Sequence, residues 1–433
     1  VNLSENFYKM RRGGLEMDLR QLLMVPLAAV FFFTAVPGFA ADVNELERRL
    51  DIVSEELDRL KSSGGSGGGL ANRTSVHGYG ETHLKTEDNG QSVLDQHRMV
   101  IGIHSELSNW IHFNVEIDFE HAAQVMEFEF GYLDFLISNS MNVRAGVMLM
   151  PMGDLNEFHE PNKFWRVERP YFHQYLLPTT WQQGGAGVFG SMGDGWQYRA
   201  YIVNAVSSLD PADGSKTDGR KFDDTKFIRS GRAQLYSVDA HDWAFTGRVE
   251  KKGEGTQFGL SFYTGDSTQG HIKEDGNLTI LEGDFQVRRG ALETKFAIMK
   301  GWVEDTSAIN TWCAGDEASC NADVPKEAFG WLLEAGVHLP QLLKWDTTHD
   351  LIPYISYEKV RPNDVTGDDA ATGKLSSTAN FHDLTVGVSY KPIDSVAVKL
   401  DYQQFFYDQS TDDLSDPDTT TKSLVNLGVA YMY

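Results

Sequence analysis

Charged side chains crowd the segment from residue 157 to residue 169, where cations and anions follow one another closely. Lys163, Arg166 and Arg169 could contact small anionic solutes, because Lys and Arg bind phosphate and carboxylate oxygens through charge-assisted hydrogen bonds. They could equally pair with Glu160 and Glu168 and only hold the segment in place. The sequence leaves both interpretations open for the candidate residues Glu157, His159, Glu160, Lys163, Arg166 and Arg169.

Other motifs that could carry chemistry are weaker. Cys313 and Cys320 are the only cysteines and lie close together, so in an exported protein we expect a disulfide between them. Gly185, Gly187 and Gly190 have the spacing of a dinucleotide-binding loop, but no strand–helix–strand unit surrounds them. The sequence therefore indicates no cofactor, no metal site and no enzyme activity.

Strands are the elements that must position these side chains. From residue 111 to residue 120, apolar and polar residues alternate without a break, which predicts a half-buried strand. About sixteen such segments recur from residue 75 to the closing segment 423–433, and helical periodicity is nearly absent among them. In the closing segment, every second residue counted back from Tyr433 to Val425 is apolar.

The composition excludes several classes of protein. The chain is 41% hydrophobic and has no long apolar run beyond its N-terminal region, which excludes a helical channel. A formal net charge of −24 argues against nucleic-acid binding. The 41 glycines and 25 phenylalanines against 13 prolines suit many strands joined by tight turns.

Each of the sixteen half-apolar strands must pair the backbone groups along its edges and keep its apolar face out of water. A closed antiparallel barrel in a membrane does both, because every backbone group is paired and the apolar face meets lipid. Short turns alternate with long polar segments at 151–184, 207–229, 305–326 and 360–380, as in outer-membrane barrels. We predict an all-β fold, a transmembrane antiparallel β-barrel of about sixteen strands over residues 73–433.

The N-terminal region predicts export. Residues 1–40 read as a leader that includes a signal peptide, since three arginines precede the apolar run 22–36 and small residues follow at 38 and 40. A membrane anchor is the alternative, although the run is short for a span. Apolar residues three and four apart predict a short periplasmic coiled coil over 41–61, or a lone amphipathic helix, and the Gly/Ser-rich segment 62–72 predicts a linker.

Several segments resemble the bacterial trimeric porins of the phosphate-selective O/P superfamily. They are FHEPNKFWRVERP, LPTTWQQGGAGVFG, YRAYIVNAV, SFYTGDSTQG and the closing SLVNLGVAYMY. The leader with the coiled coil is similar to the subset that has an N-terminal periplasmic extension. The resemblance covers the barrel and implies a sixteen-stranded homotrimer whose first long loop folds inward, and whose aromatic C-terminal residue acts as an insertion signal. Members differ in cargo, which includes phosphate, pyrophosphate and dicarboxylates.

Alternation along the strands predicts which charged residues line the lumen. The cationic set is Arg98, Arg144, Arg199, Arg248, Arg288, Lys295 and Lys399, and the anionic set is Glu116, Asp118, Asp134, Glu282, Asp284, Glu293, Glu334 and Asp401. Because both signs are present, we expect a transverse field that orients dipolar solutes. Pairing of these charges across the wall is the alternative. The acidic residues in 157–169 depart from the basic pattern of phosphate-selective members.

We therefore expect a pore in the outer membrane of a Gram-negative bacterium, in contact with outer-membrane lipids and lipopolysaccharide. It would pass small hydrophilic solutes and ions by passive diffusion, with anions such as phosphate or dicarboxylates as the finer hypothesis. Two alternatives remain. One is a barrel enzyme, and the other is a structural tether with a plugged barrel.

Overall fold

The computed structural model describes residues 73–210, 221–232, 235, 238–315, 320, 322–370, 380–408 and 421–433. The predicted leader, coiled coil and linker lie outside the described residues. The described residues all belong to one compact unit, Gly68–Tyr433.

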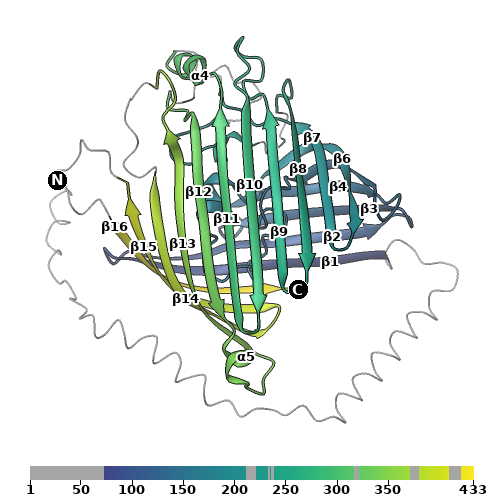
Figure 1. The fold of residues 1–433 in the computed structure, drawn as a ribbon, viewed down its shortest axis with the longest axis vertical. Coiled ribbons are helices and arrows are strands. Elements are labelled where there is room, and N and C mark those ends of the chain that lie inside the picture. Colours follow the sequence, from purple (N-terminus) through teal and green to yellow (C-terminus); the bar gives the residue numbers. More distant parts are fainter. Residues whose placement is uncertain are drawn as a thin grey trace, which may run out of the picture. The chain divides into compact units, whose positions relative to one another are not determined.

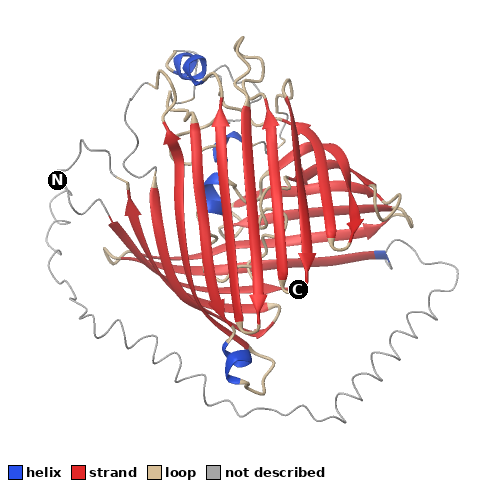
Figure 2. Cartoon of the chain, viewed as in Figure 1, coloured by secondary structure: helices blue, strands red, loops and turns tan. Residues whose placement is uncertain are grey.

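Sixteen antiparallel strands close into one barrel, in which each strand pairs with its neighbours along the chain and β1 pairs with β16 (Figures 1 and 2). The predicted sixteen-stranded antiparallel barrel is confirmed. The strands are β1 (Thr74–Glu87), β2 (Ser92–Glu106), β3 (Ile111–Glu120), β4 (Val125–Phe135), β5 (Asn142–Leu149), β6 (Gln182–Gly193), β7 (Trp196–Asn204), β8 (Trp243–Gly253), β9 (Thr256–Gly265), β10 (Leu278–Arg289), β11 (Leu292–Val303), β12 (Glu327–Val337), β13 (Asp350–Val365), β14 (Phe381–Ile393), β15 (Val396–Tyr407) and β16 (Thr421–Met432).

The seam between β1 and β16 closes through the end of the chain. The backbone N–H of Gly78 donates to the carbonyl of Tyr433 at 3.0 Å, and the N–H of Tyr433 donates back at 2.9 Å. The Tyr433 ring lies so close to Gly78 that a Cβ there would be 2.6 Å from the phenolic oxygen. Gly78 is required at this position because a Cβ would also lie 2.2 Å from the backbone carbonyl oxygen of Val100 on β2.

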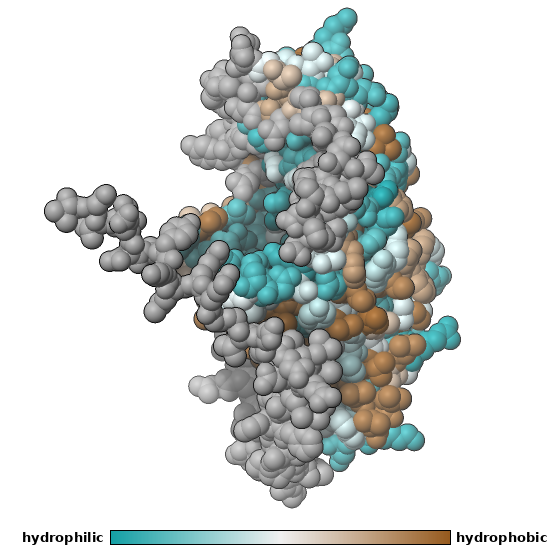
Figure 3. All heavy atoms as spheres, turned by 90° about the vertical axis from the view of Figure 1, so that its left-hand side faces the viewer, coloured by the Kyte–Doolittle hydropathy of each residue, from teal (hydrophilic) through white to brown (hydrophobic). Residues whose placement is uncertain are grey.

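The barrel wall has an apolar outer face and a polar inner face. On β16, Val425, Leu427 and Val429 are 36%, 43% and 45% exposed, whereas the intervening Asn426 and Gly428 are buried. Figure 3 shows hydrophobic residues gathered along the right-hand flank of the molecule. A fully paired wall with an apolar exterior is what a lipid bilayer requires. Among the described residues, no helix is long and apolar enough to cross a membrane.

The two ends of the barrel differ. At one, the turn end, six connections are short (107–110, 136–141, 194–195, 254–255, 290–291 and 394–395), while 338–349 is longer and contains α5 (Leu339–Leu343). At the other, the loop end, 88–91 and 121–124 are short and the remaining six are long. The latter are 150–181, 205–242, 266–277, 304–326, 366–380 and 408–420, with η3 (Arg229–Gly231) in the second and α4 (Thr306–Cys313) in the fourth. The long segments predicted from the sequence all lie at the loop end.

Residues 150–181, here called the inner loop, fold into the barrel. Their π-helix η2 (Phe172–Leu176) contacts the walls at β12 and β13. Apolar residues of the inner loop, such as Phe172 and Trp181, are fully buried in one cluster with Phe222 and Phe227 of the 205–242 connection. The two connections therefore share an apolar core that narrows the lumen.

Two of the register shifts near the loop end are β-bulges on β2 and β4. On β2, Glu81 faces Arg98 and Thr82 faces Gln96, so His97 is an extra residue. On β4, Glu116 faces Phe130 and Ile117 faces Phe128, so Glu129 is an extra residue. A bulge re-aims the side chains around it, and therefore the simple alternation of faces fails at these two positions.

Candidate functional site

The charged residues predicted to line the lumen lie on the inner face of the wall, where most are buried beneath the inner loop or its neighbours. Arg98 and Lys399 are 0% and 1% exposed. Arg288 differs, because it is exposed near the turn end, where its guanidinium donates to Gln341 at 3.2 Å. All eight anionic residues that were predicted to line the lumen are buried, namely Glu116, Asp118, Asp134, Glu282, Asp284, Glu293, Glu334 and Asp401.

Wall arginines pair with wall carboxylates. Arg144 donates to both oxygens of Asp134, at 2.8 and 2.9 Å, and its guanidinium stacks over the Tyr132 ring at 3.8 Å. Arg248 lies 2.6 Å from Asp284 and 3.5 Å from Glu282. Bidentate and stacked contacts of this kind hold the guanidinium rigidly. These charges are therefore compensated within the wall.

Arg199 and Arg98 connect the wall to its surroundings. Arg199 pairs with Glu250 on the neighbouring strand and with Glu157 of the inner loop, each at 3.1 Å. Arg98 pairs with Glu81 at 2.8 Å and also donates to the backbone carbonyl of His159 at 2.9 Å. Both arginines thereby anchor the inner loop to the wall.

Arg166 spans from the inner loop to the far wall. It is 1% exposed, and its guanidinium lies 2.7 Å from Glu358 on β13 and 3.5 Å from Asp383 on β14. Glu358 also accepts the backbone N–H groups of Tyr171 and Phe172, at 3.0 and 2.7 Å. The partners of Arg166 are thus distant wall carboxylates and not its sequence neighbours.

The remaining candidates of the inner loop have different surroundings. His159 is buried and hydrogen-bonds Tyr79 at 2.7 Å and Glu129 at 3.0 Å. Arg169 donates to Thr179. Glu160 is half-buried and Lys163 is exposed. Of the cations among the predicted constriction residues, Lys163 is therefore the most exposed.

Burial and neighbours shift the pKa values of the inner loop. Burial lowers the pKa of His173 to about 4, so the imidazole is neutral at pH 7. Burial and then the charge of Arg98 lower the pKa of Arg169. Burial acts to raise the pKa of Glu168, but the hydrogen bond with His83 and the charge of Lys85 prevail and lower it. The loop thus carries the neutral imidazole of His173 together with the ionised carboxylate of Glu168.

Three wall lysines hold the tip of the inner loop through its carbonyl oxygens. Lys295 donates to the carbonyl of Lys163 at 3.2 Å, and Lys391 donates to that of Asn162 at 2.8 Å. Lys399 donates to the carbonyl of Arg166 at 2.8 Å and to that of Pro161. Together with Lys163, these form the lysine cluster, which lies at residues 161–166 of the loop. No sequence pattern indicated that Lys391 belongs to it.

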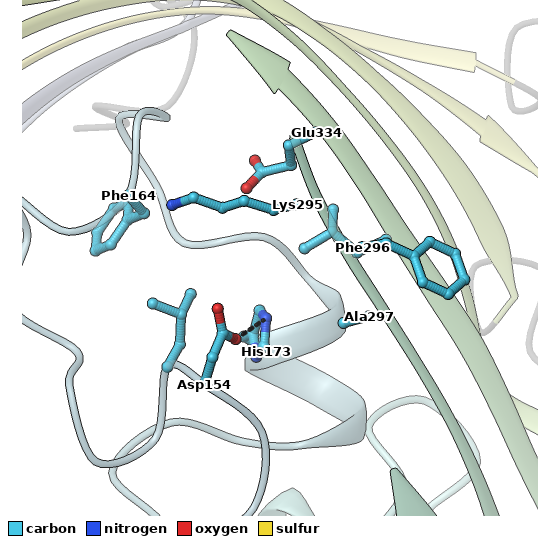
Figure 4. Close-up of a pocket in the computed structure, with 9 residues that line it drawn as sticks. Asp154, Phe164, His173, Lys295, Phe296, Ala297 and Glu334 are labelled. Atoms are coloured by element: carbon cyan, nitrogen blue, oxygen red, sulfur yellow. Dashed lines mark ion pairs between the residues drawn. The ribbon is translucent and has the colours of Figure 1, made fainter. Parts of the chain in front are cut away.

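A small cavity of about 10 Å³ separates the inner loop from β11 and β12 (Figure 4). Asp154 and His173 lie 3.4 Å apart on the loop side, and Lys295 and Glu334 line the wall side. The cavity has room for about one water molecule. The loop therefore packs closely against this part of the wall, and the lysine cluster lies beside it.

The other sequence motifs lie apart from the lumen contacts. Cys313 and Cys320 form a disulfide within the 304–326 connection. Gly185, Gly187 and Gly190 lie on β6, within the barrel wall. A Cβ at Gly187 would lie 2.2 Å from the carbonyl oxygen of Ala200, so the glycine serves close strand packing.

Comparisons with known proteins identify the fold. No family model matches the chain. An uncharacterized protein of Aquifex aeolicus is 29% identical over 353 residues, which cover 78% of this chain and 77% of the relative. Among solved structures, OmpF of Salmonella typhi in complex with daunomycin has a TM-score of 0.53 at 10% identity and covers 83% of this chain and 97% of its own. An anion-selective porin from Comamonas acidovorans has a TM-score of 0.50 at 10% identity and covers 83% and 99%. The chain has the fold of the outer-membrane porins.

Proposed function

We propose that this protein is an outer-membrane porin through which small hydrophilic solutes and ions diffuse passively. The observation that carries the proposal is a closed barrel with an apolar exterior, a charged inner face and a loop anchored inside by ion pairs. An inward loop in a polar lumen sets the size and charge of what can pass. The proposal assigns no reaction to the chain.

The proposed solutes are anions, such as phosphate or dicarboxylates. The buried arginines of the wall and inner loop have carboxylate partners, whereas the wall lysines of the lysine cluster donate to neutral carbonyl oxygens. Glu293 is the nearest carboxylate to Lys295, at 3.9 Å. The exposed Lys163 has no carboxylate within ion-pair distance in the described part of the chain, and its positive charge attracts anions to the loop tip. The resemblance to the phosphate-selective O/P superfamily supports the same choice.

The proposed setting is the outer membrane of a Gram-negative bacterium, where the protein forms a homotrimer in contact with lipid and lipopolysaccharide. The apolar exterior supports the membrane location. The resemblance supports the trimer, the leader over 1–40, the periplasmic coiled coil over 41–61 and the linker over 62–72. The mass of the detergent-solubilised complex tests the trimer, since a monomeric mass would reject it.

Planar-bilayer recording of the purified full chain tests the proposed function. We expect discrete conductance steps and, in a salt gradient, a reversal potential that indicates anion preference. Lys163→Glu, an exposed change in the lysine cluster, should shift the reversal potential toward cations. The matched control is Lys273→Glu, which reverses the charge of an exposed lysine in the 266–277 connection and should change it little.

The possible outcomes separate the two parts of the proposal. If the protein inserts into the bilayer but gives no conductance, the porin function is rejected and a structural tether with a plugged barrel is favoured. The apolar core that the inner loop forms is the observation that supports this alternative. Conductance with a cation preference that Lys163→Glu leaves unchanged would reject only the anion preference.

A further inference from the structure

Two histidines and an aspartate meet at the loop end, on β2 and on the 121–124 connection, away from the lysine cluster. His121 Nδ1 lies 2.8 Å from Asp95 Oδ2, and His97 Nδ1 lies 3.5 Å from the same oxygen. One potential ligand atom from each residue lies within 4.8 Å of the other two. We propose that Asp95, His97 and His121 form a binding site for one divalent transition-metal ion, with Zn²⁺ as the reference ion.

The donor types and distances fit such an ion. Two imidazoles and a carboxylate suit Zn²⁺ and its transition-metal neighbours better than Ca²⁺ or Mg²⁺, which prefer oxygen ligands. Ligand atoms about 2.0–2.2 Å from a tetrahedral zinc lie about 3.3 Å apart. The observed separations of 2.8 and 3.5 Å bracket this value, so side-chain rotations suffice to admit the ion.

The site is open to ions from solution. The side chains of Asp95, His97 and His121 are 25%, 19% and 47% exposed. Three protein ligands leave a fourth position for water or an anion. The site is therefore both accessible and incomplete without a solvent ligand, as exchangeable metal sites are.

The bulge on β2 creates this arrangement. Met99 lies on the outer face and is 41% exposed, and unbroken alternation would place His97 and Asp95 on that same face. Because His97 is the extra residue, Asp95 instead lies opposite the buried His83 of β1, and the His97 ring stacks on the His83 ring at 4.8 Å. A single inserted residue therefore moves two potential ligands from the lipid face to the interior.

The connection between β3 and β4 supplies the third ligand in a fixed position. His121, Ala122 and Ala123 have φ values of 51°, 56° and 68°, so three consecutive residues other than glycine adopt a left-handed conformation. Such a run is unfavourable unless the surroundings stabilise it. The N–H of His121 donates to the carbonyl of His97 at 3.1 Å, and that of Ala122 donates to the carbonyl of Gln96 at 3.2 Å. These bonds hold His121 beside His97 before any ion arrives.

Two other groupings of potential ligands lie nearby, His83 with His97 and Glu168, and Glu116 with Glu129 and His159. In the first, Lys85 pairs with Glu168, so an ion would have to displace an ammonium group. In the second, all three side chains are buried and His159 is bonded to Tyr79. The grouping of Asp95, His97 and His121 is the most open to solvent of the three, and among the described residues no lysine or arginine pairs with its members.

Titration of the full chain in detergent with ZnCl₂, followed by calorimetry, tests the proposal. The protein must carry no polyhistidine tag. We expect one ion per chain, and at least about a hundredfold weaker binding for His121→Ala, whose position outside the strand ladder leaves folding intact. Asp95→Asn should also weaken binding. The matched control is His349→Ala, which removes an exposed histidine bonded to Tyr390 near the turn end and should leave binding unchanged.

A second readout uses Co²⁺, whose visible absorption reports coordination by nitrogen and carboxylate ligands, and this absorption should disappear in His121→Ala. The absence of Zn²⁺ binding by the wild-type chain would overturn the proposal. Wild-type affinity in His121→Ala would overturn it too, as would loss of binding in Glu168→Gln or Glu129→Gln with retention in His121→Ala. Circular dichroism and resistance to unfolding in cold SDS establish that each variant is folded.

Discussion

Removal of the Arg166 guanidinium is expected to release the inner loop from the far wall. In Arg166→Ala, Glu358 and Asp383 lose their buried cation. Both carboxylates are 0% exposed, so water cannot easily replace the guanidinium while the loop stays docked. The docked state should therefore lose stability relative to states in which the loop leaves the wall.

The size of the effect follows from the burial of the pair. Removal of one partner from a buried ion pair typically costs about 3–5 kcal/mol. Glu358 keeps two backbone N–H donors, from Tyr171 and Phe172, which places the expected cost near the lower figure. At about 1.4 kcal/mol per factor of ten, a cost of about 3 kcal/mol changes the ratio of docked to released loop by about a hundredfold.

Single-channel recording and thermal unfolding in detergent measure this change. We expect Arg166→Ala to give larger or less steady conductance and a lower unfolding temperature. The double variant with Arg166→Met and Glu358→Gln should recover part of the lost stability, because it leaves fewer buried charges unpaired. Lys163→Ala, an exposed change in the same loop, is the control and should stay within about 0.5 kcal/mol of wild type.

The reasoning is refuted if Arg166→Ala matches Lys163→Ala in conductance, current noise and unfolding temperature. That result would mean that the ion pairs of Arg166 do not hold the loop, and that the apolar core and the wall lysines suffice.

Three further predictions follow from the described contacts. Burial lowers the pKa of His173 from 6.5 to about 4. The contribution of this histidine to the free energy of unfolding is therefore complete above about pH 6.5 and declines as the pH falls toward 4. The unfolding temperature should show this decline in wild type and lack it in His173→Gln. Replacement of Cys313 and Cys320 by Ser removes a short loop closure worth about 2–3 kcal/mol, so protease cleavage within 304–326 should accelerate while barrel unfolding stays unchanged. In Gly78→Val, a Cβ 2.2 Å from the carbonyl oxygen of Val100 should disrupt the pairing of β1 with β2, seen as loss of the SDS-resistant folded band. Gly283→Ala, whose closest contact is a leucine methyl group at 3.3 Å, should keep that band.

The barrel was predictable from the sequence because alternation is a local property. In residues 111–120 and in the closing segment 423–433, the alternation of apolar and polar residues identifies the apolar face of the strand. Sixteen strands with one apolar face each can keep those faces out of water in only a few architectures. The inward positions of Glu282 and Lys399 follow from the same rule. Polar connections separate the strands clearly, so the long segments were also located correctly.

The bulges at His97 and Glu129 could not be predicted in this way. Each adds one residue to a strand without a glycine or proline to mark it. Simple alternation therefore places Asp95 on the wrong face of β2. The metal-site hypothesis depends on the strand register around the bulge, which cannot be read from the sequence. The pair D-x-H at Asp95 and His97 was the only local signal, and on a regular strand it would have faced lipid.

The contacts of the inner loop were also beyond the sequence. Arg166 lies close to Glu160 and Glu168 along the chain, but its partners Glu358 and Asp383 are about two hundred residues away. The local charge pattern cannot show which carboxylates pair with Arg166, because the path of the loop inside the barrel determines the pairing. The same holds for Lys391, which meets the loop at Asn162.

The pairing of β1 with β16 makes the barrel a ring in which each strand has two equivalent neighbours. Tyr433 lies next to Gly78, so a short peptide could join the final residue to the start of β1, and the chain could be cut instead in a surface connection such as 254–255. The circularly permuted polypeptide would keep all sixteen pairings while starting at a different strand. No strand of this barrel is therefore architecturally the first.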